Sequence, residues 1–120
     1  MTKKKITIYE KPTWTTCRNL ATLFRENGID AERINYFNQP FTEQSLRKLI
    51  MKLGLSPFEI LRKGEAQAKE LGLNAETSPG EIIKYIVQYP ALLQRPIVEV
   101  GDRAILARPA EKALTIVSGS

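Results

Sequence analysis

The order of apolar and polar positions near the start of the chain predicts a strand, a helix and a second strand. Residues 6–9 read Ile-Thr-Ile-Tyr, an alternation that favours a β-strand. A helical spacing of apolar residues follows and ends before Gly28, a typical helix stop: Trp14, Cys17, Leu20, Ala21 and Phe24. Residues 31–36 form a second extended run. This order within about thirty residues predicts a right-handed βαβ crossover with parallel strands.

Residues 42–93 read as an inserted helical segment with repeated start signals. Thr42 is placed as an N-cap before an apolar face made of Leu46, Leu49, Ile50 and Leu53. Residues 56–59, Ser-Pro-Phe-Glu, combine an N-cap, a proline at the first helical position and a capping-box glutamate, so a helix is expected there. Residues 78–81 repeat this pattern, and a short helix is expected at residues 65–71.

The last part of the chain returns to a strand pattern. Residues 97–100 and 104–107 are short apolar runs on either side of Gly101-Asp102, the signature of a hairpin, and residues 109–117 predict a helix beginning at Pro109. The predicted order is therefore βαβ, a helical insertion at about 42–93, then ββα. We expect one α/β domain, residues 1–120, with a small mixed sheet flanked by helices.

Composition narrows the classes of function. The chain has one cysteine and no histidine, which argues against a disulfide framework and a metal site and fits a cytoplasmic protein. No long apolar run is present, so neither a signal peptide nor a membrane contact is expected. The net charge of +5 is spread over the whole chain, which favours a bias toward small anions and predicts no direct binding of nucleic acid.

Cys17 stands where two effects on its thiol oppose each other. It falls in the first turn of the predicted helix, where the helix dipole stabilises a thiolate. It also lies on the apolar stripe, where a cysteine is buried as a small hydrophobe. The stripe predicts slow alkylation of Cys17 in the folded protein.

Four segments of the chain resemble the arsenate reductase (ArsC) family, which includes the Spx-type regulators. The first loop of that family reads Tyr-x-x-Pro-x-Cys-x-x-Cys/Ser-Arg, and residues 9–18 here read Tyr-Glu-Lys-Pro-Thr-Trp-Thr-Thr-Cys-Arg. Residues 61–63, 94–98 and 107–112 resemble its three arginine-bearing segments, in the same order. The resemblance runs from about Ile6 to Val117 and implies a thioredoxin-like fold.

The resemblance also implies roles for particular residues. The arginines that grip the oxyanion in the family correspond to Arg62, Arg95 and Arg108, and the peptide bond before Pro96 is implied to be cis. Guanidinium suits this task because it stays charged and binds oxyanions in a fork. In arsenate reductases the first-loop cysteine attacks arsenate, and glutathione or glutaredoxin then resolves the adduct.

The sequence departs from the family pattern at the nucleophile. Trp14 stands at the position of the attacking cysteine, and Cys17 at the position of the second cysteine of Cys-x-x-Cys members. An indole ring cannot carry out the attack. We expect the rest of the site to lie in the first loop and helix start: Pro12, Thr13, Trp14, Thr15 and Arg18.

Three hypotheses follow. The first is an arsenate-reductase-like, thiol-dependent oxidoreductase that binds an oxyanion or glutathione, with Cys17 as the catalytic residue, no bound cofactor, and glutathione or glutaredoxin as the external reductant. The second is a non-catalytic regulatory or protein-binding module, as in Spx-type members, which engage RNA polymerase. The third is an anion-binding relic with no redox role.

Overall fold

The structure is a computed structural model that describes residues 5–11 and 13–117. The chain divides into two compact units, one made of the residues up to 39 together with those from 95 onward, and one made of residues 40–94. The second unit coincides closely with the helical insertion expected at about 42–93. The expectation that the whole chain forms one domain stays a prediction.

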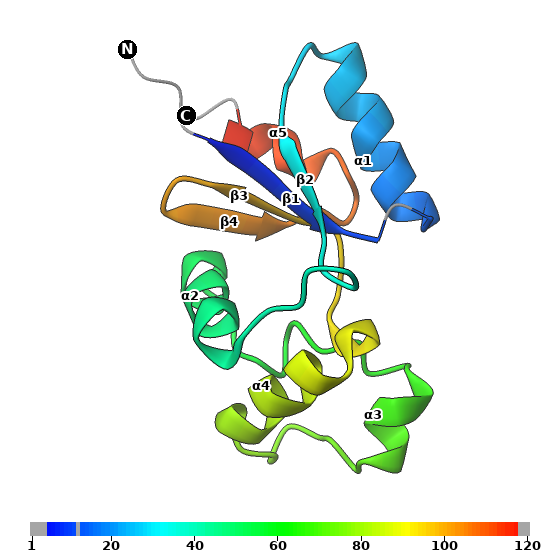
Figure 1. Cartoon of the computed structure of the whole chain (residues 1–120), viewed down its shortest axis with the longest axis vertical. Coiled ribbons are helices and arrows are strands. Elements are labelled where there is room, and N and C mark those ends of the chain that lie inside the picture. Colours follow the sequence, from blue (N-terminus) through cyan, green and yellow to red (C-terminus); the bar gives the residue numbers. More distant parts are fainter. Residues whose placement is uncertain (1–4, 12, 118–120) are drawn as a thin grey trace. The chain divides into compact units, whose positions relative to one another are not determined.

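In the first unit, the described residues form one four-stranded sheet in the order β2-β1-β3-β4 (Figure 1). The strands are β1 (Ile6–Glu10), β2 (Glu32–Asn35), β3 (Ile97–Val100) and β4 (Arg103–Leu106). The β1 and β2 strands are parallel and joined by helix α1 (Thr15–Glu26), while β3 is antiparallel to both β1 and β4. This mixed sheet confirms the predicted α/β class and the βαβ start.

Helices α1 and α5 (Lys112–Val117) contribute to a single core on one face of this sheet. Its buried members include Leu20 and Phe24 from α1 and Ile116 from α5, packed with Ile8 and Val98 of the sheet. Such apolar contacts supply most of the free energy that holds a helix against a sheet. Cys17, Leu20 and Phe24 of the predicted apolar stripe form the buried face of α1, whereas Trp14 precedes the helix and Ala21 is only partly buried.

The β3–β4 hairpin and the last helix of the first unit test two predictions from the sequence. The hairpin is present, with a two-residue loop in which Gly101 has a φ of 62°, a conformation that glycine adopts without a steric cost. The last helix was expected to begin at Pro109, which is wrong, because α5 begins at Lys112. Residues 108–111 form turns instead, in which the Lys112 N–H donates to the Pro109 carbonyl at 3.0 Å.

The second unit contains helices α2 (Glu43–Leu53), α3 (Ala66–Glu70), α4 (Pro79–Gln88) and the 3₁₀ turn η1 (Pro90–Leu92). Thr42 caps α2 as expected, since its hydroxyl accepts from the Ser45 N–H at 3.0 Å and the Ser45 side chain accepts from the Thr42 N–H. The Ser78 hydroxyl caps α4 by accepting from the Glu81 N–H at 3.3 Å. None of the helices in the described part of the chain is long and apolar enough to cross a membrane.

The helix expected after Ser56 does not form. The capping hydrogen bonds are present, with Ser56 N–H donating to a Glu59 carboxylate oxygen at 2.6 Å, but only a turn follows. The Ile60 carbonyl accepts from the Gln94 N–H at 2.9 Å, and the Arg62 N–H donates to the carbonyl of Leu92 at 2.6 Å. These backbone groups are thus committed to a distant segment, so they cannot form the ladder of a helix.

Candidate functional site

The end of the sheet where β1 stops gathers several segments of the first unit. Because β2 is parallel to β1, the segment that follows it begins at the same end. Because β3 is antiparallel to β1 and β4 is antiparallel to β3, Arg95 precedes β3 and Arg108 follows β4 there too. The Ala107 N–H donates to the Pro96 carbonyl at 2.9 Å and holds these two segments together. The peptide bonds after both arginines are cis.

Arg95 is surrounded by aromatic rings. Its guanidinium carbon lies 3.4 Å from the centroid of the Trp14 ring and 5.4 Å from that of Phe37. Its Nη1 donates to the hydroxyl of Tyr36 at 3.0 Å, and both Arg95 and Tyr36 are only 1% exposed. A guanidinium stacked on an indole face is held by cation–π attraction, which strengthens where water is excluded.

Lys11 adds a second cation to the same group. Its Nζ lies 4.6 Å from the centroid of the Phe37 ring and 5.9 Å from that of Trp14. We call Lys11, Trp14, Tyr36, Phe37 and Arg95 the aromatic–arginine cluster. The sequence did not identify Tyr36 and Phe37 as members of the site. The signal for them was their place directly after β2, since the ends of parallel strands lie at one edge of a sheet.

The other two arginines named by the resemblance have different surroundings. Arg108 is exposed. Arg62 belongs to the second unit, where its guanidinium pairs with the Glu65 carboxylate at 3.6 Å, and both side chains are about one quarter exposed. Of the three arginines, Arg95 therefore contacts Trp14, Arg108 is exposed, and Arg62 pairs with Glu65 inside the second unit.

Cys17 is fully buried, as the apolar stripe predicted. It is 0% exposed and lies on the same face of α1 as Leu20 and Phe24. Burial raises the pKa of its thiol, and a backbone hydrogen bond with Lys11 and the charge of Arg95 oppose this shift without reversing it. The thiol is thus protonated more firmly than a free cysteine, the reverse of what a nucleophile needs.

The first loop supplies the start of α1. Trp14 is the N-cap residue, with an extended backbone and no side-chain capping bond, and its N–H donates to the Lys11 carbonyl at 3.0 Å. The side chains of Thr13 and Thr15 are exposed, and the Thr15 hydroxyl accepts from Arg18 at 3.4 Å. Pro12, also named from the sequence, lies outside the described residues.

The site presents cations and aromatic faces around a loop whose thiol is covered. Among the residues that the structure describes, no group of three or more His, Cys, Asp or Glu side chains could hold a metal ion.

A four-stranded mixed sheet that is built as βαβ, a helical insertion and ββα defines a thioredoxin-like fold. A family model described as the ArsC family matches residues 9–116. The chain therefore belongs to the ArsC family.

Individual relatives agree with this assignment. The chain is 35% identical to the uncharacterized protein YfgD of Escherichia coli K12, over 95% of this chain and 98% of that one. It is 36% identical to the arsenate reductase of the same organism, over 93% of this chain and 80% of the other. The solved structure of an arsenate reductase from Vibrio cholerae has a TM-score of 0.90 and 28% identity, and the match covers 96% of this chain and 99% of that one.

Proposed function

We propose that this ArsC-family protein is a non-catalytic binding module that recognises a protein partner through the end of the sheet where the aromatic–arginine cluster lies. One observation carries the proposal. The chain has a single cysteine, and this cysteine is 0% exposed. Thiol chemistry requires a thiolate that reaches its substrate, and the buried, protonated thiol of Cys17 meets neither condition.

The cluster has the composition of a contact surface. Tryptophan is among the residue types that contribute most to binding free energy at protein interfaces. Trp14 and Phe37 are partly exposed, Lys11 lies over both rings, and the Arg95 guanidinium stacks on the Trp14 ring. A partner that covers this surface would meet a preorganised aromatic platform, which lowers the entropic cost of binding. The resemblance to Spx-type regulators makes RNA polymerase the first partner to test, followed by glutaredoxin.

The reactivity of Cys17 tests the proposal directly. We expect the native protein to react with a thiol reagent such as DTNB at least about a hundredfold more slowly than the same protein in denaturant, because reaction requires opening of the fold. The measurement is the pseudo-first-order rate of absorbance change under both conditions. Equal rates would show that the thiol is accessible and would remove the observation on which the proposal depends.

A thiol-dependent oxidoreductase is the second candidate. It is favoured by the place of Cys17 in the first turn of α1, where a backbone hydrogen bond and the Arg95 charge lower the pKa of its thiol against the larger effect of burial. In this hypothesis a small oxyanion or thiol substrate meets Arg95 and Arg108 of the first unit. The resemblance names Arg62 as well, which belongs to the second unit. Reduction of arsenate takes two electrons, which external thiols such as glutathione supply by forming a disulfide.

The substitution Trp14→Cys separates the two candidates. It restores a Cys-x-x-Cys loop with the new thiol at the helix start, where the dipole and Arg95 favour the thiolate. We expect the variant to gain glutathione- and glutaredoxin-dependent reduction of arsenate, measured as NADPH consumption through glutathione reductase, while the parent chain is inactive. Trp14→Ser is the matched control, because it opens the loop equally without adding a thiol.

One result would replace the proposed assignment, and another would strengthen it. Activity in the parent chain that Cys17→Ser abolishes would make Cys17 the working nucleophile and replace the binding module by the enzyme. A folded Trp14→Cys variant with no more activity than Trp14→Ser would show that the site has lost more than its nucleophile, and this would strengthen the binding module.

A further inference from the structure

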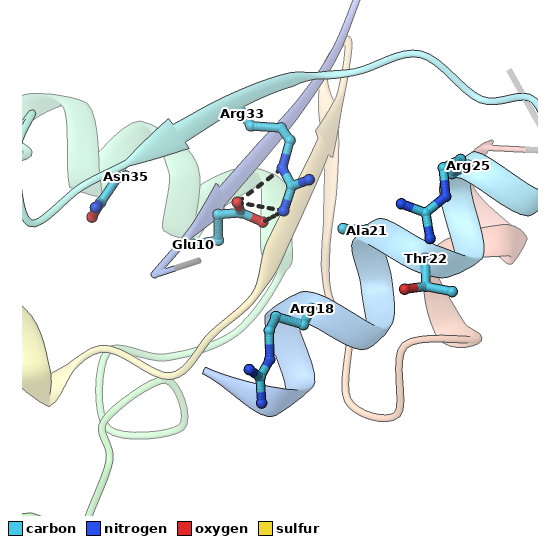
Figure 2. A pocket seen from close by; sticks show the side chains of 7 residues that line it. All are labelled: Glu10, Arg18, Ala21, Thr22, Arg25, Arg33 and Asn35. Atoms are coloured by element: carbon cyan, nitrogen blue, oxygen red, sulfur yellow. Dashed lines mark hydrogen bonds and ion pairs between the residues drawn. The ribbon is translucent and has the colours of Figure 1, made fainter. Parts of the chain in front are cut away.

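An open depression lies between α1 and the adjoining strands of the first unit (Figure 2). Its volume is about 500 Å³, and residues from β1, α1 and β2 line it: Glu10, Arg18, Ala21, Thr22, Arg25, Arg33 and Asn35. Three of these described lining residues are arginines and one is acidic. The depression shares no residue with the aromatic–arginine cluster, although its lining residue Asn35 contacts Phe37 of that cluster.

The acidic residue of the depression is already paired. Glu10 is 1% exposed and forms a bidentate ion pair with Arg33, in which Nε and Nη2 of the arginine donate to the two carboxylate oxygens at 2.9 and 2.8 Å. Figure 2 shows the remaining terminal nitrogen of Arg33 turned toward α1. Whether Glu10 is ionised against Arg33 or protonated, its charge does not cancel that of Arg18 and Arg25.

The two arginines of α1 have no acidic partner along their own helix. The positions three and four residues before and after Arg18 and Arg25 hold Trp, Thr, Ala, Gly and Ile, so an intrahelical ion pair cannot form. Both side chains are exposed. They lie seven residues apart, which places them about 10 Å apart along the helix axis, with the small side chains of Ala21 and Thr22 between them.

Asn35 adds a neutral donor at the strand side. Its side-chain oxygen accepts from the Phe37 N–H at 3.0 Å, which leaves the amide NH₂ as the group that can meet a ligand oxygen. The lining thus offers guanidinium and amide donors over an apolar floor of small side chains and arginine stems.

We infer that this depression binds an acidic segment of a partner protein. Arginine pairs with carboxylates in a fork, so carboxylates are the complementary groups. Two exposed arginines about 10 Å apart along α1 can each pair with a different carboxylate of one acidic segment. The depression is less suited to bind an isolated small anion, because pockets for small molecules enclose most of the ligand surface and this depression is open. The inference does not rest on the proposed function, because it uses neither Cys17 nor the cluster.

The test uses the full chain and a fluorescein-labelled peptide of ten residues that alternates Glu and Ala. We expect saturable binding by fluorescence anisotropy at about 0.15 M ionic strength, where exposed charges more than about 8 Å apart are largely screened. Arg25→Glu and Arg18→Glu should each weaken this binding at least about tenfold, which corresponds to about 1.4 kcal/mol. Arg103→Glu is the matched control. It makes the same change in charge at an exposed position of β4 in the same unit, outside the depression, and should alter the affinity by less than about twofold. Circular dichroism confirms that each variant is folded.

Three outcomes would overturn the inference. Equal weakening by Arg103→Glu would mean that the peptide senses only the net charge. Displacement of the peptide by inorganic phosphate, but not by sodium chloride at the same ionic strength, would assign the depression to a small anion. Absence of saturable binding to the folded protein would exclude an acidic segment.

Discussion

The aromatic–arginine cluster and the α1 depression both belong to the sheet-bearing unit, and both are built on arginine, yet they use it in opposite ways. In the cluster, Arg95 is 1% exposed and its guanidinium contacts an indole face and a phenol hydroxyl of the same chain. In the depression, Arg25 is exposed beside a glutamate that is already paired with Arg33. A cation that is held by its own protein contributes to stability, whereas a cation in water contributes to binding.

The largest expected effect is the difference in stability between a variant truncated at Arg95 and one truncated at Arg25. Arg95→Ala should lower the free energy of unfolding by about 2–4 kcal/mol, because it removes a buried side chain together with its contacts to Trp14 and Tyr36. Arg25→Ala should change it by less than about 0.5 kcal/mol, as is usual for an exposed position. Urea unfolding followed by circular dichroism measures both values without relying on the fluorescence of Trp14. Equal losses in the two variants would abolish the distinction between the regions.

A smaller effect is expected from the phenol that holds Arg95. Tyr36→Phe keeps the ring and removes the hydroxyl that accepts from Arg95 Nη1, so the free energy of unfolding should fall by about 1–2 kcal/mol. Tyr85→Phe on α4, a partly buried tyrosine, is the control and should cost less than about 0.5 kcal/mol. The same urea titrations report both. A loss in Tyr36→Phe no larger than in the control would mean that the rings alone hold Arg95.

The parts of the fold that could be predicted from sequence are those with local signals. The hairpin at Gly101, the cap at Thr42 and the burial of Cys17 each follow from a few neighbouring residues. The helix expected after Ser56 failed because backbone hydrogen bonds to residues 92–94 outweigh a local cap, and no local pattern reveals such partners.

The candidate site also has residues that the sequence could name and contacts that it could not predict. The resemblance named Trp14 and Arg95 separately, but their stacking depends on how the strands are paired. Tyr36 carried no motif, and its role exists only once β2 lies parallel to β1. The Glu10–Arg33 pair likewise depends on strand register, which periodicity alone does not fix.

The smallest expected effect concerns the protonation of Glu10, which decides whether Arg33 of the depression is available to a partner. Burial raises the pKa of this carboxyl, and the hydrogen bond and charge of Arg33 oppose the shift without cancelling it. The folded state therefore binds a proton at Glu10 more readily than the unfolded state does. The resulting stabilisation is complete below the pKa of an unfolded glutamate and is lost as the pH rises through the folded pKa.

Glu10→Gln removes this titration while keeping the shape of the side chain. The difference in unfolding free energy between the parent and Glu10→Gln should therefore shift in favour of the parent as the pH is lowered from 7 to 4. Urea unfolding at four pH values across this range measures the difference. A shift in the opposite direction would mean that Arg33 outweighs burial and holds Glu10 ionised. In that case the depression would contain a permanent carboxylate tied to a permanent guanidinium, and only Arg18 and Arg25 would remain to attract an acidic partner. The expected direction instead means that protonation of Glu10 weakens its hold on Arg33, so that a third arginine becomes available to carboxylates as the pH falls.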